Sequence, residues 1–205
     1  MSDLVKALLP HFKRENWSGP DNLPISLRPP GRDQGRPALA LVMRDLGFIK
    51  GIEIGTHAGR SAQMWCHTIP YLHLICIDPY RAYSGVRQRR LDRHYEKAKT
   101  ALSGYNAEII RKPSGDVAEV FDDKSVDFVY IDGDHSFDAV VIDIIKYAPK
   151  VRTGGLVLVH DYFHFHGGGV VAAVDGYTHF HVIDPWYVTF DTAPTAFWQR
   201  GVERI

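Results

Sequence analysis

Short apolar runs alternate with amphipathic segments along most of the chain. Residues 48–54, 72–77 and 126–131 are rich in β-branched and aromatic side chains and are followed by glycine or aspartate, which predicts buried strands. Strands separated by helical patterns predict βαβ units and a parallel sheet covered on both faces. The predicted elements in order are the strand 48–54, the helix 60–68, the strand 72–77, the helix 88–102, the strand 107–111, the helix 116–121, the strand 126–131, the helix 137–148 and the strand 156–159.

The first 37 residues do not follow this alternation. Apolar positions recur at helical spacing over residues 3–14, which predicts a helix. Residues 16–37 are rich in proline, glycine, asparagine and aspartate, and they predict a long irregular segment of the kind that forms lids or binding loops. A second helix is then predicted over residues 37–46, with Gly47 as its stop.

The C-terminal end also differs from the middle of the chain. Glycines 167–169 lead into a short predicted helix, and residues 179–190 and 195–200 resemble two strands joined only by a turn. We therefore predict one domain over residues 1–205, with an N-terminal helix and lid or loop segment over 1–37 and an α/β core over 38–205. The predicted fold class is a doubly wound, Rossmann-like α/β fold whose mostly parallel seven-stranded sheet ends in a C-terminal antiparallel strand pair.

Composition narrows the classes of partner and compartment. The chain has 205 residues with a formal net charge of zero, which gives no general reason to expect a nucleic acid or an anionic membrane as partner. No apolar run approaches the roughly 20 residues of a membrane-spanning helix. The early acid at Asp3 and the lack of a long apolar leader predict a cytoplasmic protein. Cys66 and Cys76 fall in a helical and a strand pattern, which favours buried thiols over a disulfide.

The central predicted strand, 126–131, ends in Asp132-Gly133-Asp134-His135. Open α/β sheets bind their ligands at the carboxyl ends of their strands, so two carboxylates and an imidazole there indicate a functional site. The alternative is a polar strand-to-helix turn in which Asp134 or Ser136 caps the following helix.

The first strand–helix junction carries an acid and a glycine loop, Glu53, Gly55 and Gly59. It matches neither the Gly-x-Gly-x-x-Gly fingerprint nor a P-loop, and its glycines also suit tight strand–helix packing. The next strand ends at Asp78, about 20 residues further on, where an acid is the usual partner of ribose hydroxyls. The alternative for Asp78 is the start of an Asp-Pro turn.

The strand after the central one ends in His160-Asp161. In the expected sheet this end lies beside Asp132, so the three residues are candidates to converge on one divalent cation. Carboxylates with water suit Mg²⁺ or Mn²⁺, and an imidazole shifts the preference toward Mn²⁺, Fe²⁺ or Zn²⁺. The alternative is that His160 and Asp161 only form hydrogen bonds with loop backbone.

Taken together, these motifs resemble class I S-adenosylmethionine-dependent methyltransferases. They are Glu53-x-Gly55-x-x-x-Gly59, Asp78, Ser114, Tyr130-Ile-Asp132-Gly-Asp134-His135-Ser-Phe137 and Gly154-Gly155-Leu-Val-Leu-Val-His160-Asp161-Tyr162. The resemblance is strongest to the methyltransferase 24 family, which includes sugar O-methyltransferases, and covers roughly residues 38–165.

The resemblance implies a role for each motif. The cofactor S-adenosylmethionine would contact Glu53, Gly55, Thr56, Gly59, Ser61, Asp78, Ser114 and Asp132. Asp132, His160 and Asp161 would hold a divalent metal, Mg²⁺ or Mn²⁺, although the metal-dependent members carry an acid where this chain has His160. The catalytic base matches Asp134 in the sugar methyltransferases and His135 in the catechol type, and the sequence leaves this choice open.

These assignments predict a metal-assisted O-methyltransferase that acts on a hydroxyl of a small polar molecule. We expect residues 16–37, the loop at 80–86 and the histidine-rich loop after Asp161 to form the pocket for this acceptor. Two alternatives stay open: a nucleotide-binding oxidoreductase on the same fold, which the missing dinucleotide fingerprint disfavours, and a catalytically inactive cofactor-binding protein. The sequence does not identify the acceptor, nor does it decide whether the chain forms a homo-oligomer.

Overall fold

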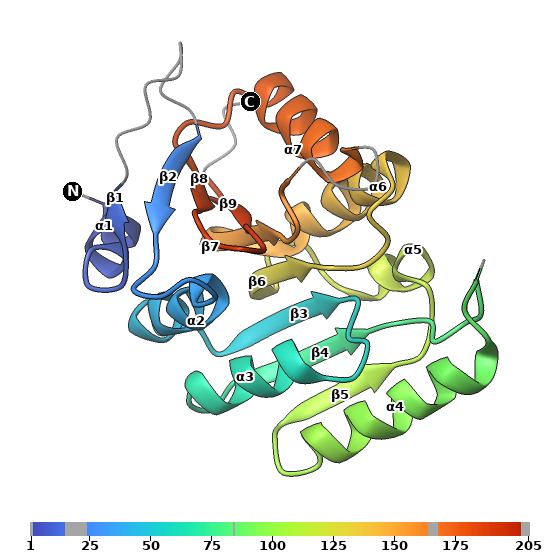
Figure 1. The fold of residues 1–205 in the computed structure, drawn as a ribbon. Coiled ribbons are helices and arrows are strands. Elements are labelled where there is room, and N and C mark those ends of the chain that lie inside the picture. The colour runs from blue at the N-terminus through green and yellow to red at the C-terminus, as the bar shows by residue number, and fades with distance from the viewer. Residues whose placement is uncertain (1, 15–23, 84, 164–167, 202–205) are drawn as a thin grey trace.

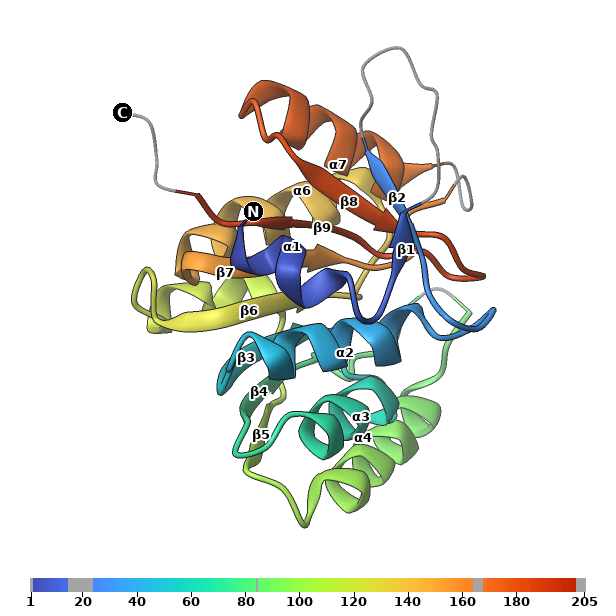
Figure 2. The same ribbon diagram turned by 90° about the vertical axis from the view of Figure 1, so that its left-hand side faces the viewer.

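A single mixed sheet forms the centre of the molecule, with helices on both of its faces (Figures 1 and 2). The computed structural model describes residues 2–14, 24–83, 85–163 and 168–201. The helices are α1 (Asp3–Leu8), α2 (Gly35–Asp45), α3 (Arg60–Thr68), α4 (Gln88–Leu102), α5 (Ser114–Val117), α6 (Phe137–Tyr147) and α7 (Gly169–Phe180), with short 3₁₀ turns η1 (Ala118–Val120) and η2 (Ala148–Lys150). The strands are β1 (Lys13–Arg14), β2 (Ile25–Arg28), β3 (Lys50–Ile54), β4 (His73–Ile77), β5 (Ala107–Ile110), β6 (Val126–Ile131), β7 (Val151–Val159), β8 (Trp186–Thr189) and β9 (Ala196–Gln199).

The nine strands lie in the order β1-β2-β8-β9-β7-β6-β3-β4-β5. Strands β7, β6, β3, β4 and β5 are parallel to one another, and β9 pairs antiparallel with both β7 and β8. The predicted doubly wound fold with its C-terminal antiparallel pair is therefore confirmed. None of the helices in the described part of the chain has the length and apolar character needed to cross a membrane.

The N-terminal segment contains two strands that the sequence analysis missed. Residues 25–28 form β2, which pairs parallel with β8, so the prediction of an irregular segment over 16–37 is wrong there. The exposed edge of β8 offers unpaired backbone groups, and β2 satisfies them while burying Leu27. The predicted helix over 3–14 stops at Leu8, because Pro10 lacks the N–H that would continue it. Residues 15–23 lie outside the described part of the chain.

The predicted strand over 179–190 is also wrong in its first half. Helix α7 continues to Phe180, and β8 begins only at Trp186. Val170 and Val174 are buried at helical spacing, so packing of this face against α6 determines the structure of the segment. Pro185 has no N–H to donate to a sheet, which agrees with the late start of the strand.

Alternate strand residues face two separate cores. On one face, Leu74, Phe128 and Leu158 pack with the side chains of α2 and α3. On the other face, Ile75 and Val129 belong to the core that includes α6 and α7. Figure 1 shows these two helical layers on opposite sides of the sheet. Because both faces are covered, only the ends of the strands remain for polar chemistry.

Backbone hydrogen bonds continue the parallel ladder one residue beyond four strands. The N–H of Gly55 donates to Ile77 at 2.9 Å, and the N–H of Asp132 donates to Ile54 at 2.8 Å. The equivalent bonds from Asp78 to Ile110 and from His160 to Ile131 are 3.2 and 2.9 Å long. The polar residues after the strands are thus positioned by the sheet itself.

A buried carboxylate holds together the amino-terminal ends of three strands, opposite the polar residues just described. Asp127 accepts hydrogen bonds from the N–H groups of Ile49 and Lys50, at 2.7 and 2.8 Å. Its other oxygen lies 2.6 Å from Nε of Arg152 at the start of β7. One side chain therefore connects the entrances of β3, β6 and β7.

We expect Asp127→Ala to reduce the free energy of unfolding by about 2–3 kcal/mol, because two backbone N–H groups lose their acceptor and Arg152 loses its ion pair. The matched control is Asp123→Ala, which removes a 64% exposed carboxylate from an ion pair with Lys150 and should cost less than about 1 kcal/mol. Urea unfolding of both variants measures the difference. Equal losses would show that Asp127 does not fasten this edge.

Candidate active site at the carboxyl ends of the strands

Two carboxylates and a histidine meet where β6 and β7 end. Nδ1 of His160 lies 3.3 Å from Oδ1 of Asp132 and 3.1 Å from Oδ1 of Asp161. The structure thus brings together the three residues that the sequence analysis named as metal ligands. Asp161 adopts a left-handed backbone with φ of 57°, a conformation that aspartate and asparagine tolerate better than most residues.

A second histidine lies against the same carboxylates. Nε2 of His135 is 3.4 Å from Oδ2 of Asp161 and 3.7 Å from Oδ1 of Asp132. One ligand atom from each of these three residues lies within 4.8 Å of the other two. The site therefore offers two carboxylates and two imidazoles, one imidazole more than the predicted ligand set.

His160 is the most buried member of this cluster. It is 5% exposed, its Nδ1 faces the two carboxylates, and its Nε2 is buried without a hydrogen-bond partner in the described structure. Burial alone would lower the pKa of His160, but the neighbouring carboxylates of Asp132 and Asp161 raise it to about 9. Burial opposes ionisation of Asp132, yet His135 and His160 hold the pKa of that carboxyl at about 2.

The donor set fits a divalent cation. Two carboxylate oxygens with imidazole nitrogens suit Mn²⁺, Fe²⁺ or Zn²⁺, and Mg²⁺ accepts the carboxylates with water. The buried Nε2 of His160, which has no partner among the described residues, is the kind of polar atom that requires one.

Asp134 has a local structural role. Its Oδ1 accepts the N–H of Ser136 at 2.8 Å in the turn before α6, and its side chain is exposed. Ser136 is the N-cap residue of that helix but forms no capping bond with its side chain. The turn alternative raised by the sequence therefore applies to Asp134, whereas His135 faces the carboxylates.

The glycine loop after β3 packs directly on the end of β6. Gly55 has φ of 90°, and a Cβ atom there would clash with the carbonyl oxygen of Asp132. Gly59, also left-handed, precedes α3 and packs on Ala98 of α4. These glycines serve close packing, the alternative given above, and they also bring the loop to the carboxylate cluster.

Glu53 is a buried acid beneath this loop. It is 1% exposed, and Nε1 of Trp65 donates to its Oε1 at 3.3 Å. Its Oε2 and the hydroxyl of Thr56 are buried without a hydrogen-bond partner. Burial, followed by the nearby Asp132 carboxylate, raises the pKa of Glu53 well above its ordinary value. A cationic ligand group beside the loop would favour the charged form of Glu53 and would give its Oε2 a partner, so this arrangement is compatible with an ammonium or sulfonium compound.

Asp78 orders two loops through its carboxylate. One oxygen accepts the N–H of His57 at 2.8 Å, and the other accepts the N–H of Tyr80 at 2.8 Å. The second bond is the Asp-Pro turn named as the alternative, and the first links Asp78 to the glycine loop. The position is compatible with ribose binding, because each carboxylate oxygen has a further lone pair.

The loop after β5 is held by α6. The hydroxyl of Ser114 donates to Asp143 at 2.6 Å, and the hydroxyl of Tyr147 donates to the carbonyl of Ser114 at 2.7 Å. Sequence reasoning missed Asp143, because nothing in the pattern of the helix predicted over 137–148 marks this acid as buried. Burial raises the pKa of Asp143 to about 6, despite its bond with Ser114.

Sequence reasoning also missed Arg36. It lies in the first turn of α2, is half-buried, and its guanidinium donates to Oγ of Ser61 at 3.1 Å. No spacing signal pointed to it, because a single arginine within a predicted loop has no pattern.

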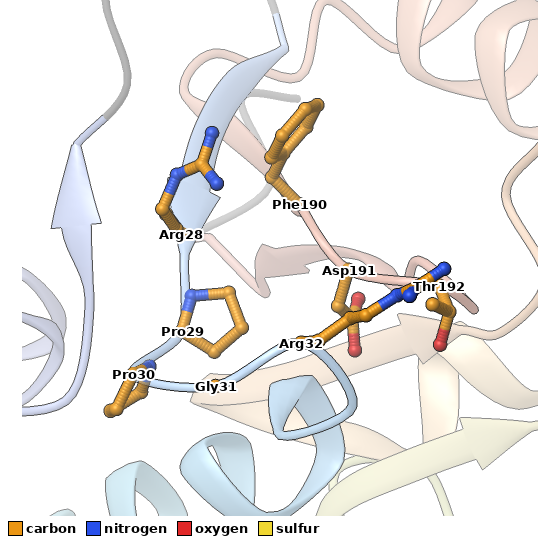
Figure 3. Close-up of a pocket in the computed structure, with 8 residues that line it drawn as sticks. All are labelled: Arg28, Pro29, Pro30, Gly31, Arg32, Phe190, Asp191 and Thr192. Atoms are coloured by element: carbon orange, nitrogen blue, oxygen red, sulfur yellow. The ribbon is translucent and has the colours of Figure 1, made fainter.

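A hollow of about 370 Å³ lies between the loop after β2 and the loop after β8 (Figure 3). Its walls are Arg28, Pro29, Pro30, Gly31, Arg32, Phe190, Asp191 and Thr192. Asp191 joins the two loops by accepting the N–H of Gly35 at 3.0 Å. Residues 29–32 come from the segment that the sequence analysis assigned to the acceptor pocket, but the loop at 80–86 is not part of this hollow, and residues 164–167 are outside the described structure.

A family model described as a methyltransferase domain matches residues 52–162, more than half of the 205-residue chain. The chain belongs to this methyltransferase family. The predicted relationship to S-adenosylmethionine-dependent methyltransferases of the methyltransferase 24 type is thereby confirmed, and it excludes the oxidoreductase alternative as the family assignment.

Individual relatives of this methyltransferase are distant. An uncharacterized protein of Acanthamoeba polyphaga mimivirus is 30% identical over 115 residues, which cover 54% of this chain and 50% of that protein. The chain thus spans about half the length of this curated relative.

Solved structures share the fold. Cofactor-bound Rv0187 from MTB superposes with a TM-score of 0.64 at 16% identity, covering 97% of this chain and 88% of that one. The O-methyltransferase TomG from Streptomyces achromogenes, involved in tomaymycin synthesis and solved in complex with S-adenosylmethionine, gives 0.61 at 19% identity, with 98% and 91% covered. At such identities the likeness establishes the fold of the methyltransferase and nothing finer.

We expect Asp78→Ala to weaken S-adenosylhomocysteine binding by roughly tenfold or more, because a charged hydrogen bond contributes about 1.5–3 kcal/mol. Calorimetry measures this affinity, and Asp123→Ala, which removes an exposed acid away from the strand ends, is the control. An unchanged affinity in a folded Asp78→Ala protein would remove Asp78 from the cofactor site.

Asp143 should make stability depend on pH. Its folded pKa of about 6 lies above the ordinary 3.8, so the unfolded chain loses this proton first and the free energy of unfolding falls as pH rises from about 4 to 6. The difference between the two pKa values corresponds to a change of at most about 3 kcal/mol in the free energy of unfolding. Asp143→Asn should therefore stabilise the methyltransferase at pH 8 relative to the parent and have little effect at pH 3.5. Urea unfolding at both pH values measures this, and an equal effect at the two would contradict the burial argument.

Proposed function

We propose that the protein transfers a methyl group from S-adenosylmethionine to a hydroxyl oxygen of a small polar molecule, with a divalent cation at the end of β6 and β7. The observation that carries this proposal is the convergence of Asp132, His135, His160 and Asp161 at one point of the sheet edge. Two acids with two imidazoles match the requirements of a cation that holds a hydroxyl and of a base that removes its proton.

The proposal also assigns residues to the cofactor. In the proposal, the loop Glu53, Gly55, Thr56 and Gly59 and the helix start at Ser61 hold the methionine part, Asp78 holds the ribose, and Ser114 lies near the adenine. Support comes from the unpartnered Oε2 of Glu53 and hydroxyl of Thr56, which call for a ligand. The sulfonium of S-adenosylmethionine supplies a methyl group that is already electrophilic.

The chain must then position a hydroxyl and remove its proton. A bound divalent cation would supply Lewis acidity and a fixed orientation for the hydroxyl oxygen. Asp132, His160 and Asp161 are the proposed ligands, which leaves His135 to accept the proton at Nε2. Its distance of 3.4 Å from Asp161 supports His135, since Asp134 is exposed and already engaged with the N–H of Ser136. Such a base contributes typically 10²–10⁴-fold to the rate.

The acceptor would approach from the same sheet edge. Strand β8 runs parallel to β7 and β2 runs parallel to β8, so the hollow beside Phe190 opens at the carboxyl ends of these strands. We propose this hollow as part of the acceptor pocket. Asp191, which lines it, is affected electrostatically by His160 and Arg36, which supports its proximity to the cluster.

The proposed cation site can be tested by metal binding alone, without turnover. Calorimetry with Mn²⁺ alone should show one equivalent bound, and Asp161→Asn should weaken it by about tenfold or more while keeping the left-handed backbone. Asp138→Asn, an exposed acid in the first turn of α6, is the matched control and should leave Mn²⁺ affinity unchanged. If Asp161→Asn binds Mn²⁺ as tightly as the parent, the cluster is not a cation site.

The two histidines should separate binding from proton transfer. His160→Ala should weaken Mn²⁺ binding, whereas His135→Ala should retain Mn²⁺ and lose about 10²-fold or more in methyl transfer. Transfer is measured with methyl-labelled S-adenosylmethionine and a panel of vicinal diols as acceptors. Loss of Mn²⁺ binding in His135→Ala alone would exchange the two roles. An absence of transfer to any diol by a parent protein that binds the cofactor would support the inactive, cofactor-binding alternative.

A further inference from the structure

Arg36 introduces a positive charge into an acidic site. It comes from the second residue of α2, whereas the acids come from the ends of β6 and β7. Burial acts to lower the pKa of Arg36, but Tyr130 and Asp132 outweigh burial and raise that pKa. The guanidinium therefore remains charged at every relevant pH.

The guanidinium has two polar neighbours, the hydroxyl groups of Tyr130 and Ser61, but no ion pair with a described residue. Its hydrogen bond to Oγ of Ser61 is 3.1 Å long. Within the described ranges, no carboxylate lies at ion-pair distance from Arg36. Asp132 and Asp161 favour this charge without forming an ion pair with it, and an anionic ligand group beside Ser61 would pair with the guanidinium directly.

The start of α3 strengthens the preference for an anion at this place. Ser61 is the second residue of this nine-residue helix, and its N-cap residue Gly59 provides no side-chain cap. The first intrahelical backbone bond is donated by Gln63, so the preceding N–H groups have no intrahelical acceptor. Such groups favour negative charge, and here they lie beside the guanidinium that Ser61 contacts.

A positively charged ligand group would also find a partner next to this site. Glu53 ends β3, its Oε1 accepts the N–H of Trp65 in α3, and its Oε2 is buried without a partner. This acid and the guanidinium of Arg36 act on each other electrostatically, and a zwitterionic amino acid group carries the two complementary charges.

We propose that Arg36 and Ser61 together bind the α-carboxylate of the amino acid end of S-adenosylmethionine. The proposal rests on the proposed use of this cofactor and adds a residue outside the family motifs, since Arg36 precedes the matched region 52–162. The guanidinium of an arginine offers two parallel N–H donors to a carboxylate, and the hydrogen bond to Ser61 fixes its orientation.

The test compares two ligands that differ in one group. S-adenosylhomocysteine carries the carboxylate, and decarboxylated S-adenosylhomocysteine keeps the amine but lacks it. We expect the parent protein to prefer the first ligand, and Arg36→Gln to weaken S-adenosylhomocysteine by about tenfold or more while changing the affinity for the decarboxylated ligand less than twofold. Isothermal calorimetry gives all four affinities.

Two further variants complete the design. Arg44→Gln, in the last turn of the same helix, removes an exposed guanidinium paired with Asp45 and should leave both affinities unchanged. Arg36→Lys keeps the charge but loses the paired N–H donors, so it should partly reduce the preference for S-adenosylhomocysteine over the decarboxylated ligand. This variant serves as the test if Arg36→Gln does not fold.

Each outcome decides the proposal. Equal weakening of both ligands would make Arg36 a counter-ion of the acidic cluster, and unchanged affinities would assign it to the acceptor; either result overturns the carboxylate site. A parent protein that binds neither ligand would instead overturn the proposed use of the cofactor, so the two failures are distinguishable.

Discussion

The parallel backbone ladder is the constraint on which the site depends. Gly55, Asp78, Asp132 and His160 each donate a backbone N–H to the last residue of a neighbouring strand. Because these bonds extend the sheet by one position, side chains that lie far apart in sequence are placed at one edge with little freedom. Residues on the faces of the strands are committed to two apolar cores, so the edge is where the fold can present charged groups.

Placing so many charges at one edge has an energetic cost that the cluster only partly offsets internally. Asp132 and His160 stabilise each other's charged forms, which lowers one pKa to about 2 and raises the other to about 9. Burial and the nearby Asp132 raise the pKa of Glu53, although Trp65 and Arg36 oppose this rise. Unsatisfied atoms remain on both Glu53 and His160. Functional sites commonly store such destabilisation, and binding of a cation and a zwitterionic cofactor would relieve it.

Periodicity alone was sufficient to predict the strands of the parallel core, since the buried runs around Ile52, Ile75 and Val129 are continuous and end at polar residues. It failed where tertiary contacts, and not the local pattern, determine the secondary structure. Strand β2 is short and proline-flanked, and only the open edge of β8 makes it a strand. Residues 179–180 have a β-like composition but belong to α7, because Val170 and Val174 already commit that segment to a helix.

The same limit applies to the site. Residues directly after strands, such as Asp132 and Asp161, could be located from the pattern, because their position follows from the order of the sheet. Arg36 and Asp143 reach the site from helices, so their contacts depend on how α2 and α6 pack. Whether Asp134 or His135 faces the carboxylates depends on the rotation of one turn. The bond from Ser136 to Asp134 sets this rotation, and no spacing rule describes it.

The most direct test of the central claim is a crystal structure grown with Mn²⁺ and S-adenosylhomocysteine, with anomalous scattering recorded for the metal. The account predicts one anomalous peak within coordination distance of Asp132 and Asp161, with an imidazole nitrogen as a further ligand. An occupied cofactor site without a peak between these two carboxylates, or a peak elsewhere on the chain, would contradict it.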